Sequence, residues 1–471
     1  MGSKWATVSI DDIKSPEKYS CVGGPFGSSL SQKHYVDSGV PVIRGTNLAG
    51  DIFSESGFVF VSPDKANELQ RNMAFRGDIV FTQRGTLGQV ALIPEDSIYE
   101  RYIVSQSQMK LTVNPKQADA YFIYTYFRTN EAKALIENNA IVGGVPHINL
   151  GILKEFKLRL PPLSEQKRIS EVSKSIDNKI NLNRQINQTL EQISQTLFKS
   201  WFVDFDPVID NVLDAGNPIP EALQSRAELR QKVRNSADFK PLPADIRALF
   251  PAEFEETELG WVPKGWKIST AGDELVVKGG STPSTSNPDF WENGTTHWTS
   301  PKDLTGNDSK VLLDTSKKIT ELGLKKISSG LLPTDTVLMS SRAPIGYLAL
   351  AKTPMAINQG YIAIPSSKNL SPEYIIYWLE NIMDDIKAIA GGTTFAEISK
   401  GAFKTISLVI PSKNIVGEFT RLAHQHFEKV VSNTEQITAL TNLRDTLLPK
   451  LISGELSLED LPDLVTQTEP A

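Results

Sequence analysis

The chain has 471 residues, 40% of them hydrophobic and 22% charged, and a formal net charge of −6. That length suits two or three globular domains, while no stretch reaches the ~18 consecutive apolar residues of a membrane span and no secretory leader is visible. The single cysteine, Cys21, excludes an intramolecular disulfide framework, so we expect a cytoplasmic protein with no membrane partner.

The acidity is concentrated in two segments. Residues 206–258 carry five more acidic than basic side chains and residues 411–471 carry four more, whereas residues 1–160 and 259–410 are close to neutral. The negative net charge therefore does not exclude a basic, DNA-binding face on either of the neutral segments.

The first segment, residues 1–160, has the pattern of a mixed β-rich domain. "GDIVFTQRGTLGQVALIP", from Gly77, alternates apolar and polar residues on both sides of a polar turn, which predicts a β-hairpin with Arg84 at its tip. A strand pattern from Val104, an amphipathic helix from Ala118 and a double glycine at Gly143 follow in order.

The same order recurs in residues 259–410. "TDTVLMSSRAPIGYLALAK", from Thr334, predicts a second hairpin with Arg342 at its tip, and a strand, an amphipathic helix and a double glycine again follow. Pro161 aligns with Pro411, and this offset of 250 continues without a gap through the next forty residues. The chain is therefore a tandem repeat of two similar copies, each a β-rich segment followed by a long helical pattern.

A long helical pattern follows each copy, at residues 161–205 and 411–453. Apolar residues three and four apart form one stripe, and Glu165–Trp201 would extend about 55 Å at ~1.5 Å per residue. We predict an α+β fold with two pseudo-repeated β-rich domains separated by two long helices that pack as an antiparallel coiled coil. The alternative is that each helix packs only on its own domain. Residues 206–258 would be the connector between the copies, and residues 454–471 an acidic, disordered tail.

An asparagine interrupts the apolar stripe at the middle of each helix, Asn183 in the first and Asn433 in the second. If the helices are antiparallel about a pseudo-two-fold axis, we expect the two side chains to hydrogen-bond each other and fix the register. The alternative is that both point to solvent.

Two blocks carry a resemblance to a known family. "PPLSEQKRI" leading to "NQTLEQISQTLFKSWFVDFDPV", and "ELGWVPKGWK" at the start of the second copy, resemble the specificity subunit of type I restriction–modification enzymes. The resemblance covers the whole chain. It implies that residues 1–160 and 259–410 are the two target-recognition domains of a subunit that reads a bipartite DNA target. It also implies recruitment of two methyltransferase subunits and of restriction subunits. Because His426 stands where the first helix has Ile176, the second docking surface is expected to bind its partner differently.

The motifs of catalysis are missing from the sequence. It has no phosphate-binding G-x-x-x-x-G-K-[ST] loop and no Asn/Asp-Pro-Pro-aromatic element of adenine methylation. Glu131 belongs to a helical face, and the i, i+2 spacing of His424 and His426 does not suit a metal site. We expect a non-catalytic subunit without a metal or cofactor of its own, with S-adenosylmethionine, ATP and Mg²⁺ on the partners.

Candidate contacts to double-stranded DNA are the polar side chains of predicted turns, since Arg, Asn, Gln, Ser and Thr read base edges. In the first copy they are Arg44, Asn47, Thr82, Gln83, Arg84, Thr86, Gln106, Gln108 and His147. In the second copy they are Trp298, Thr299, Lys302, Ser340, Ser341, Arg342, Asn358, Gln359, Thr393 and Thr394. Arg84 and Arg342 are the strongest candidates because they recur at equivalent positions.

Two alternative functions remain open from the sequence. The chain could be a self-sufficient DNA-modifying enzyme with unrecognised motifs, or a coiled-coil scaffold whose end domains do not read DNA. The purified chain would modify DNA by itself in the first case, and its complex would show no sequence preference in the second.

Overall fold

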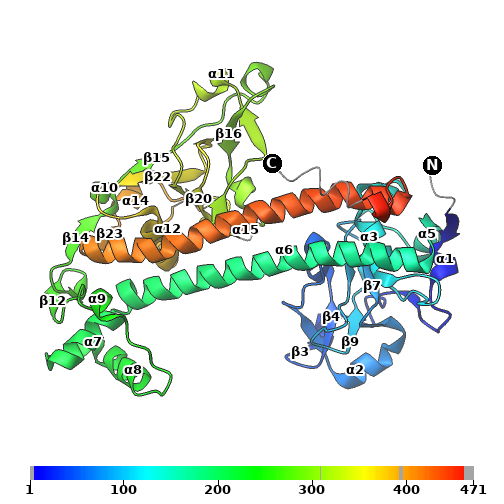
Figure 1. Cartoon of the computed structure of the whole chain (residues 1–471), viewed down its shortest axis with the longest axis horizontal. Coiled ribbons are helices and arrows are strands. Elements are labelled where there is room, and N and C mark those ends of the chain that lie inside the picture. The colour runs from blue at the N-terminus through cyan, green and yellow to red at the C-terminus, as the bar shows by residue number, and fades with distance from the viewer. Residues whose placement is uncertain (1–4, 308, 392–395, 461–471) are drawn as a thin grey trace. The chain divides into compact units, whose positions relative to one another are not determined.

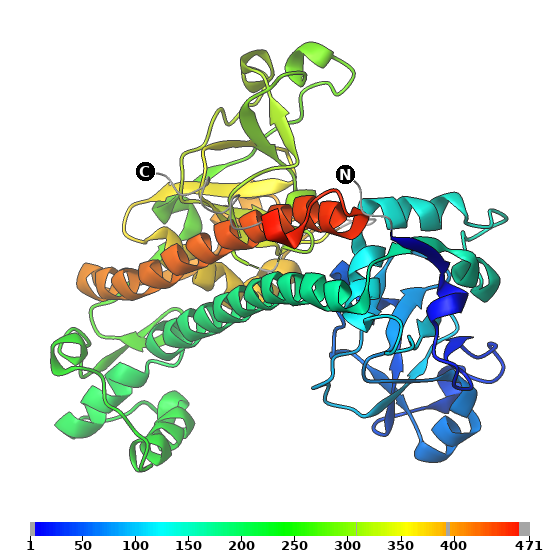
Figure 2. The same ribbon diagram turned by 45° about the vertical axis from the view of Figure 1, so that its right-hand side comes forward.

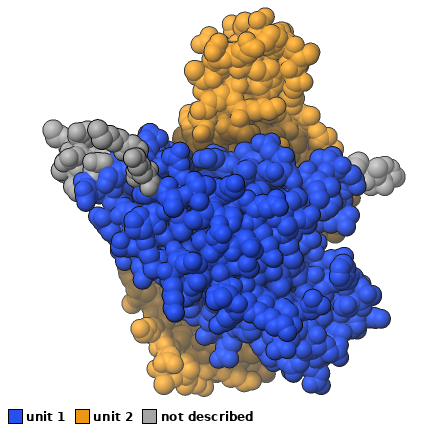
Figure 3. Space-filling model, turned by 90° about the vertical axis from the view of Figure 1, so that its right-hand side faces the viewer, with its two compact units in different colours: residues 1–180, 438–471 blue, residues 181–437 orange. Residues whose placement is uncertain are grey.

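The structure is a computed structural model that describes residues 5–307, 309–391 and 396–460. The chain divides into two compact units, residues 1–180 with 438–471 and residues 181–437 (Figure 3). Each unit therefore contains one β-rich domain and a part of both long helices. Within the described residues, no helix is long and apolar enough to cross a membrane.

The first β-rich domain contains two sheets and a closing strand pair. The first sheet has the order β2 (Cys21–Gly23), β10 (Gln108–Leu111), β7 (Ile79–Thr82), β8 (Val90–Leu92). The second has the order β3 (Tyr35–Val36), β5 (Val59–Val61), β4 (Val40–Ile43), β9 (Arg101–Val104), β6 (Met73–Phe75). β1 (Ala6–Ser9) pairs with β11 (Lys157–Leu160), so the start and the end of the domain lie together.

The second β-rich domain repeats this plan. Its larger sheet has the order β15 (Leu275–Lys278), β22 (Tyr361–Ser367), β19 (Thr336–Ser340), β20 (Leu348–Ala351), β17 (Val311–Leu312). A smaller sheet has the order β18 (Lys317–Ile319), β16 (Thr296–Thr299), β21 (Met355–Ile357). β14 (Lys267–Thr270) pairs with β23 (Ser407–Ile410), as β1 does with β11.

Both predicted hairpins are confirmed, because β7 pairs antiparallel with β8 and β19 with β20. Each predicted amphipathic helix is instead divided in two, α3 (Ala120–Arg128) with α4 (Asn130–Asn138), and α12 (Pro372–Asn381) with α13 (Met383–Ala388). In the first domain the break is at Thr129, whose ψ of 150° is not helical and whose hydroxyl accepts from the Ala132 amide. Thr129 therefore N-caps a new helix.

The remaining helices of the two domains are short. They are α1 (Ile10–Ile13), α2 (Pro63–Glu68), α5 (Leu150–Glu155), α10 (Ala271–Glu274), α11 (Glu321–Leu324) and α14 (Lys400–Lys404). The 3₁₀ segments are η1 (Gln32–His34), η2 (Gly45–Asp51), η3 (Gln70–Asn72), η5 (Glu221–Leu223), η6 (Pro288–Phe290), η7 (Pro301–Leu304) and η8 (Leu458–Asp460).

The two long helices are α6 (Leu163–Phe198), which continues as a π-helical turn to Val203, and α15 (Lys413–Ser453). They run side by side (Figures 1 and 2). Ser194 contacts His426 at 2.7 Å, and Asn183 contacts Gln436 at 2.7 Å. Since the residue number falls along α15 as it rises along α6, the predicted antiparallel pairing is confirmed.

Both stripe asparagines are buried, with 1% of Asn183 and 2% of Asn433 exposed. Asn183 donates to Gln436, and Asn433 donates to Asn187 at 2.9 Å. The predicted direct bond between Asn183 and Asn433 is therefore wrong, and so is the solvent-facing alternative. The helices are offset by about one turn from the register that would place the two asparagines opposite each other.

Each β-rich domain packs on both long helices. Leu448, Leu451 and Ile452 of α15 belong to the core of the first domain, together with Ile169 of α6. The second core takes Phe198, Trp201 and Phe202 from the end of α6 and a series of residues from Ile415 to Val430 of α15. The alternative in which each helix packs only on its own domain is therefore wrong.

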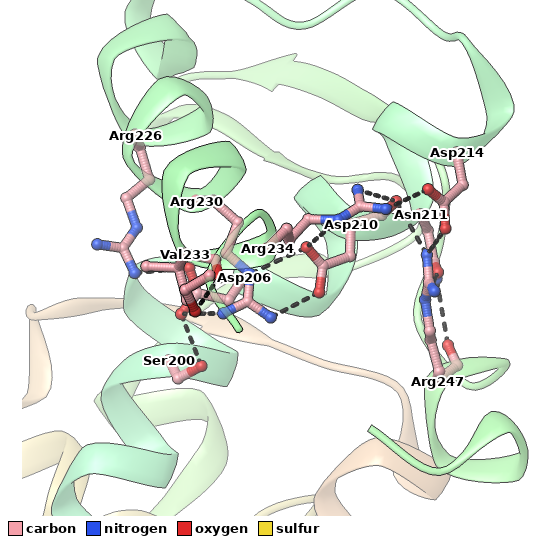
Figure 4. A network of polar contacts seen from close by, with 11 residues as sticks. Ser200, Asp206, Asp210, Asn211, Asp214, Arg226, Arg230, Val233, Arg234 and Arg247 are labelled. Atoms are coloured by element: carbon pink, nitrogen blue, oxygen red, sulfur yellow. Dashed lines mark hydrogen bonds and ion pairs between the residues drawn. The ribbon is translucent and has the colours of Figure 1, made fainter. Parts of the chain in front are cut away.

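The connector is folded and contains α7 (Asp206–Ala215), α8 (Gln224–Arg234), α9 (Ala244–Arg247) and a hairpin of β12 (Phe254–Thr257) with β13 (Gly260–Pro263). Acidic side chains every four residues along α7 pair with arginines every four residues along α8, and Arg247 joins them (Figure 4). The pairs are Asp206–Arg226 at 2.5 Å, Asp210–Arg230 at 2.6 Å, Asp214–Arg234 and Asp214–Arg247. These three acidic side chains are therefore paired within the segment.

The beginning of the expected tail is also folded. Residues 454–460 follow α15, and Leu458, which is 8% exposed, packs in the core of the first domain. The prediction of disorder is therefore wrong for these residues. Residues 461–471 lie outside the described part of the chain.

Candidate nucleic-acid interface

In the first domain, loops from four strands meet at one edge of the sheets. The end of β7, the start of β10 and the end of β2 share this edge because neighbouring strands are antiparallel. The amide of Gln83 donates to the Ser107 carbonyl at 2.7 Å, and that of Ser105 to the Ile43 carbonyl at 3.0 Å. β4 runs parallel to β9, and its end therefore reaches the same edge.

The double-glycine loop completes this edge. His147 forms an isolated antiparallel bridge with Arg84, and the Ile148 amide donates to the Gln83 carbonyl at 3.0 Å. We call the loops at residues 24–28, 44–47, 83–88, 105–107 and 141–147 the first reading edge.

The second domain assembles an equivalent edge. The Ser341 amide donates to the Gly360 carbonyl at 2.8 Å, the Asn358 amide to the Thr299 carbonyl at 2.9 Å, and the Ile398 amide to the Ser341 carbonyl at 3.1 Å. We call the loops at residues 279–286, 300–302, 341–346 and 358–360, with Gly391, Ala396 and Glu397, the second reading edge.

About half of the candidate DNA contacts are accessible on these edges. On the first edge Arg84, Thr86 and Gln106 are exposed, and Arg44, Gln83 and His147 are half-buried. On the second, Lys302 and Gln359 are exposed, and Arg342 and Asn358 are half-buried. Turn-tip residues thus present polar side chains to solvent in both domains.

Seven other candidates are buried and bonded within the protein, so their prediction as DNA contacts is corrected. They are Asn47, Thr82, Gln108, Trp298, Thr299, Ser340 and Ser341, each at most 5% exposed. Asn47, for example, accepts from the Arg44 amide and donates to the Ser54 and Ser56 carbonyls, and therefore shapes the turn. The predicted contacts Thr393 and Thr394 lie outside the described residues.

The loop that follows β2 and its counterpart after β15 also lie at these edges, although neither was among the residues predicted from the sequence. A Cβ on Gly24 would lie 1.9 Å from the Ser105 oxygen, and one on Gly280 would lie 1.8 Å from the Ile357 oxygen. Only glycine permits such an approach of two backbones. The sequence did contain a signal for these loops, because a double glycine stands at the end of a strand pattern in both copies, Gly23-Gly24 and Gly279-Gly280.

The charges on the two edges differ. The Arg84 side chain has no carboxylate partner within the described part of the chain, whereas Nη1 of Arg342 lies 3.7 Å from Oε2 of Glu397. Arg44 donates from Nη2 to the Gly57 carbonyl at 2.8 Å, which holds its guanidinium at the start of the loop.

The residues considered for catalysis or metal binding do not converge. Among the residues that the structure describes, no three or more His, Cys, Asp or Glu side chains could hold a metal ion. Glu131 is exposed in the first turn of α4. His424 contacts Glu373 at 2.9 Å and His426 contacts Ser194 at 2.7 Å, and burial lowers the pKa of His426.

Comparisons with known proteins agree with this architecture. The type I restriction modification DNA specificity domain family matches residues 3–192 and 263–442. The specificity subunit of type I restriction enzyme HindI from Haemophilus influenzae is 29% identical over 81% of this chain and 87% of its own length. The MjaIX specificity subunit from Methanocaldococcus jannaschii is 36% identical over 36% of this chain and 39% of its own.

A solved structure shows the same fold. The crystal structure of a type I restriction–modification S subunit from M. genitalium matches with a TM-score of 0.52 at 14% identity, covering 95% of this chain and 96% of that one. With the repeated domains, the antiparallel helices and the two matched segments, the chain belongs to the type I restriction–modification specificity subunits, whose function is recognition of a DNA target.

Proposed function

We propose that each reading edge contacts one half of a bipartite target, with Arg84 reading the first half and Arg342 the second. The observation that carries this proposal is the recurrence, at the same sheet edge of both domains, of an accessible arginine beside an accessible glutamine. Arginine pairs with guanine O6 and N7, and glutamine with adenine N6 and N7, in the major groove. The two edges therefore offer complementary base readers.

Replacing Arg84 or Arg342 by Ala should weaken discrimination at one base pair by roughly 1–3 kcal/mol, because a bidentate contact to guanine is lost. The measurement is binding of the assembled complex to duplexes that vary each target position, at several salt concentrations. An arginine that contacts only phosphate would instead weaken all duplexes alike and reduce the salt slope. Thr7→Ala on β1 and Thr305→Ala, both exposed and outside the two reading edges, serve as controls for the general effect of a substitution. Unchanged preference in both arginine variants would reject the proposal.

We further propose that this chain is the non-catalytic member of a multi-subunit enzyme in the cytoplasm. Two methyltransferase subunits would supply S-adenosylmethionine chemistry, and restriction subunits would use ATP and Mg²⁺. Ile193 on α6 and Leu443 on α15 support two copies of one partner, since they are equivalent at the offset of 250 and are 48% and 49% exposed. Exposed apolar side chains mark a contact site when they form part of a contiguous apolar patch.

The surface beside Ile193 has the form of an interface. An open groove of about 620 Å³ lies between α6 and the connector, and its lining includes Ile193, Leu197, Val233 and Phe239. Val233 is 49% exposed. An apolar groove with this exposure is suited to an apolar partner segment.

Replacing Ile193 or Leu443 by Glu should therefore remove one methyltransferase subunit from the complex, because a charge would be buried in an apolar contact at a cost of roughly 2 kcal/mol or more. Mass photometry of the purified assembly would measure the number of subunits. Ile98→Glu, at a position that is 71% exposed in the first β-rich domain, is the control. Retention of two methyltransferase subunits in both helix variants would show that the partner docks elsewhere.

A further inference from the structure

The second reading edge carries an acidic side chain, Glu397, at the position where the first edge has His147. His147 bridges Arg84 and Ile141, and Glu397 bridges Arg342 and Gly391 in the same antiparallel pattern. The Glu397 amide donates to the Gly391 carbonyl at 2.8 Å, as the His147 amide does to the Ile141 carbonyl at 3.3 Å. His147 and Glu397 are thus the same structural position, 250 residues apart.

Glu397 has no evident role in stabilising the fold. Its side chain is 47% exposed and that of Arg342 is 38% exposed, with 3.7 Å between Oε2 and Nη1. An ion pair as exposed as this contributes little to stability. The backbone bonds that hold the loop in place do not depend on the carboxylate, since His147 makes the equivalent bonds in the first domain.

A carboxylate on a DNA-contacting surface repels the phosphates, and a hydrogen bond that it accepts from a base can offset this cost. The exocyclic N4 amino group of cytosine is the base donor that Glu accepts from in the major groove. Guanine O6 and cytosine N4 of one base pair are about 3 Å apart because they hydrogen-bond each other. The 3.7 Å between Nη1 of Arg342 and Oε2 of Glu397 is close to that spacing.

We propose that Arg342 and Glu397 together read one guanine–cytosine pair in the second half-site. Arg342 donates to guanine O6 and N7, and Glu397 accepts from the N4 amino group of the paired cytosine. The inference rests on the proposed role of Arg342 and adds a specificity-determining residue to it. The first edge, with His147 at the same position, lacks this acceptor charge and reads a different pattern.

The test uses the complete complex with its methyltransferase subunits and a DNA library randomised across the second half-site. Methylation of each sequence gives the preference at each position. Glu397→Ala should reduce discrimination at a single base pair by roughly tenfold or more, and leave the first half-site unchanged. Glu397→His, which installs the residue of the first domain, should change the preferred base at that pair. Glu321→Ala, which removes an exposed charge on α11, is the matched control.

A modified base distinguishes direct contact of Glu397 with the cytosine from a role in which Glu397 only orients Arg342. With N4-methylcytosine at the assigned pair, the wild-type complex should bind about tenfold more weakly, because the methyl group replaces the amino hydrogen that faces the major groove. The affinity of the Glu397→Ala complex should not change with this methylation. If Glu397→Ala lowers the guanine preference but N4-methylcytosine has no effect on the wild type, Glu397 only orients Arg342 and the inference is wrong. If Arg342→Ala leaves the preference unchanged, the proposed function of that arginine fails first.

Discussion

Exchanging residues 1–160 for the same region of a relative should change one half of the methylated DNA target and leave the other half intact. The first reading edge is formed within this region, and its core is separate from that of the second domain. Methylation mapping in cells that carry the complete complex would measure the result. A change in both halves would contradict independent reading by the two domains.

The structure sets a condition on this exchange. Leu448, Leu451 and Ile452 of α15 pack in the core of the first domain, although all three lie outside the exchanged region, and Leu448 is 288 residues beyond residue 160 (448 − 160). The hybrid should therefore fold best when the donor keeps apolar residues at Phe122 and Phe127, which belong to the same core. A hybrid that exchanges only residues 259–410 is the reciprocal control, and should change only the other half of the target.

Replacing Asp177 by Ala should lower the free energy of unfolding of the first unit by about 3–5 kcal/mol. This carboxylate accepts from Tyr121 at 2.7 Å, from Arg128 at 2.5 Å and from Arg444 at 3.3 Å, and so ties α6 to α3 and α15. The Arg128 side chain is only 6% exposed, so the variant would leave a buried charge without its partner. Urea unfolding of the purified chain measures the loss.

Glu171→Ala is the matched control, because Glu171 is an exposed acidic residue on the same helix. We expect a change within about 0.5 kcal/mol for this control. A similar effect of both substitutions would show that helix composition, rather than the buried ion pair, determines the stability.

The Asp177 contribution should also depend on pH. Burial raises the pKa of Asp177, but hydrogen bonds and charge from Arg128, with Tyr121 and Arg444, outweigh burial and hold this pKa below its ordinary value of 3.8. A lowered carboxyl pKa stabilises the fold above the unfolded-state pKa, and this stabilisation is lost as the pH falls through the folded-state pKa. The difference between wild type and Asp177→Ala should therefore be constant from pH 7 to about pH 5 and shrink below about pH 4.

The second unit attaches its domain to α6 through different chemistry. Phe427 stands at the offset of 250 from Asp177, and Lys310 instead joins Glu191 of α6 to Glu380 of α12 at 3.3 and 3.0 Å. Burial lowers the pKa of Lys310, but the two carboxylates outweigh it and raise that pKa. Internal repetition thus preserved the fold while the polar contacts diverged.

The sequence by itself determined the repeat, the two hairpins with Arg84 and Arg342 at their tips, and the two long helices. These features depend on local periodicity and on an offset of 250 that needs no three-dimensional information. The antiparallel direction was predicted but was not determined by the repeat, since a pseudo-two-fold axis along the helices would make them parallel; the contacts of Asn183 with Gln436 and of Ser194 with His426 established it.

Only the tertiary structure decided which polar candidates face solvent and which partners the helices contact. Thr82 and Ser340 are buried while Arg84 and Arg342, two residues farther along, are accessible, because neighbouring strands cover the ends of β7 and β19 but not the turns beyond. The partner of Asn183 proved to be Gln436 because the helix offset depends on packing of both domains against both helices. Such contacts join residues hundreds of positions apart, and local periodicity carries no information about them.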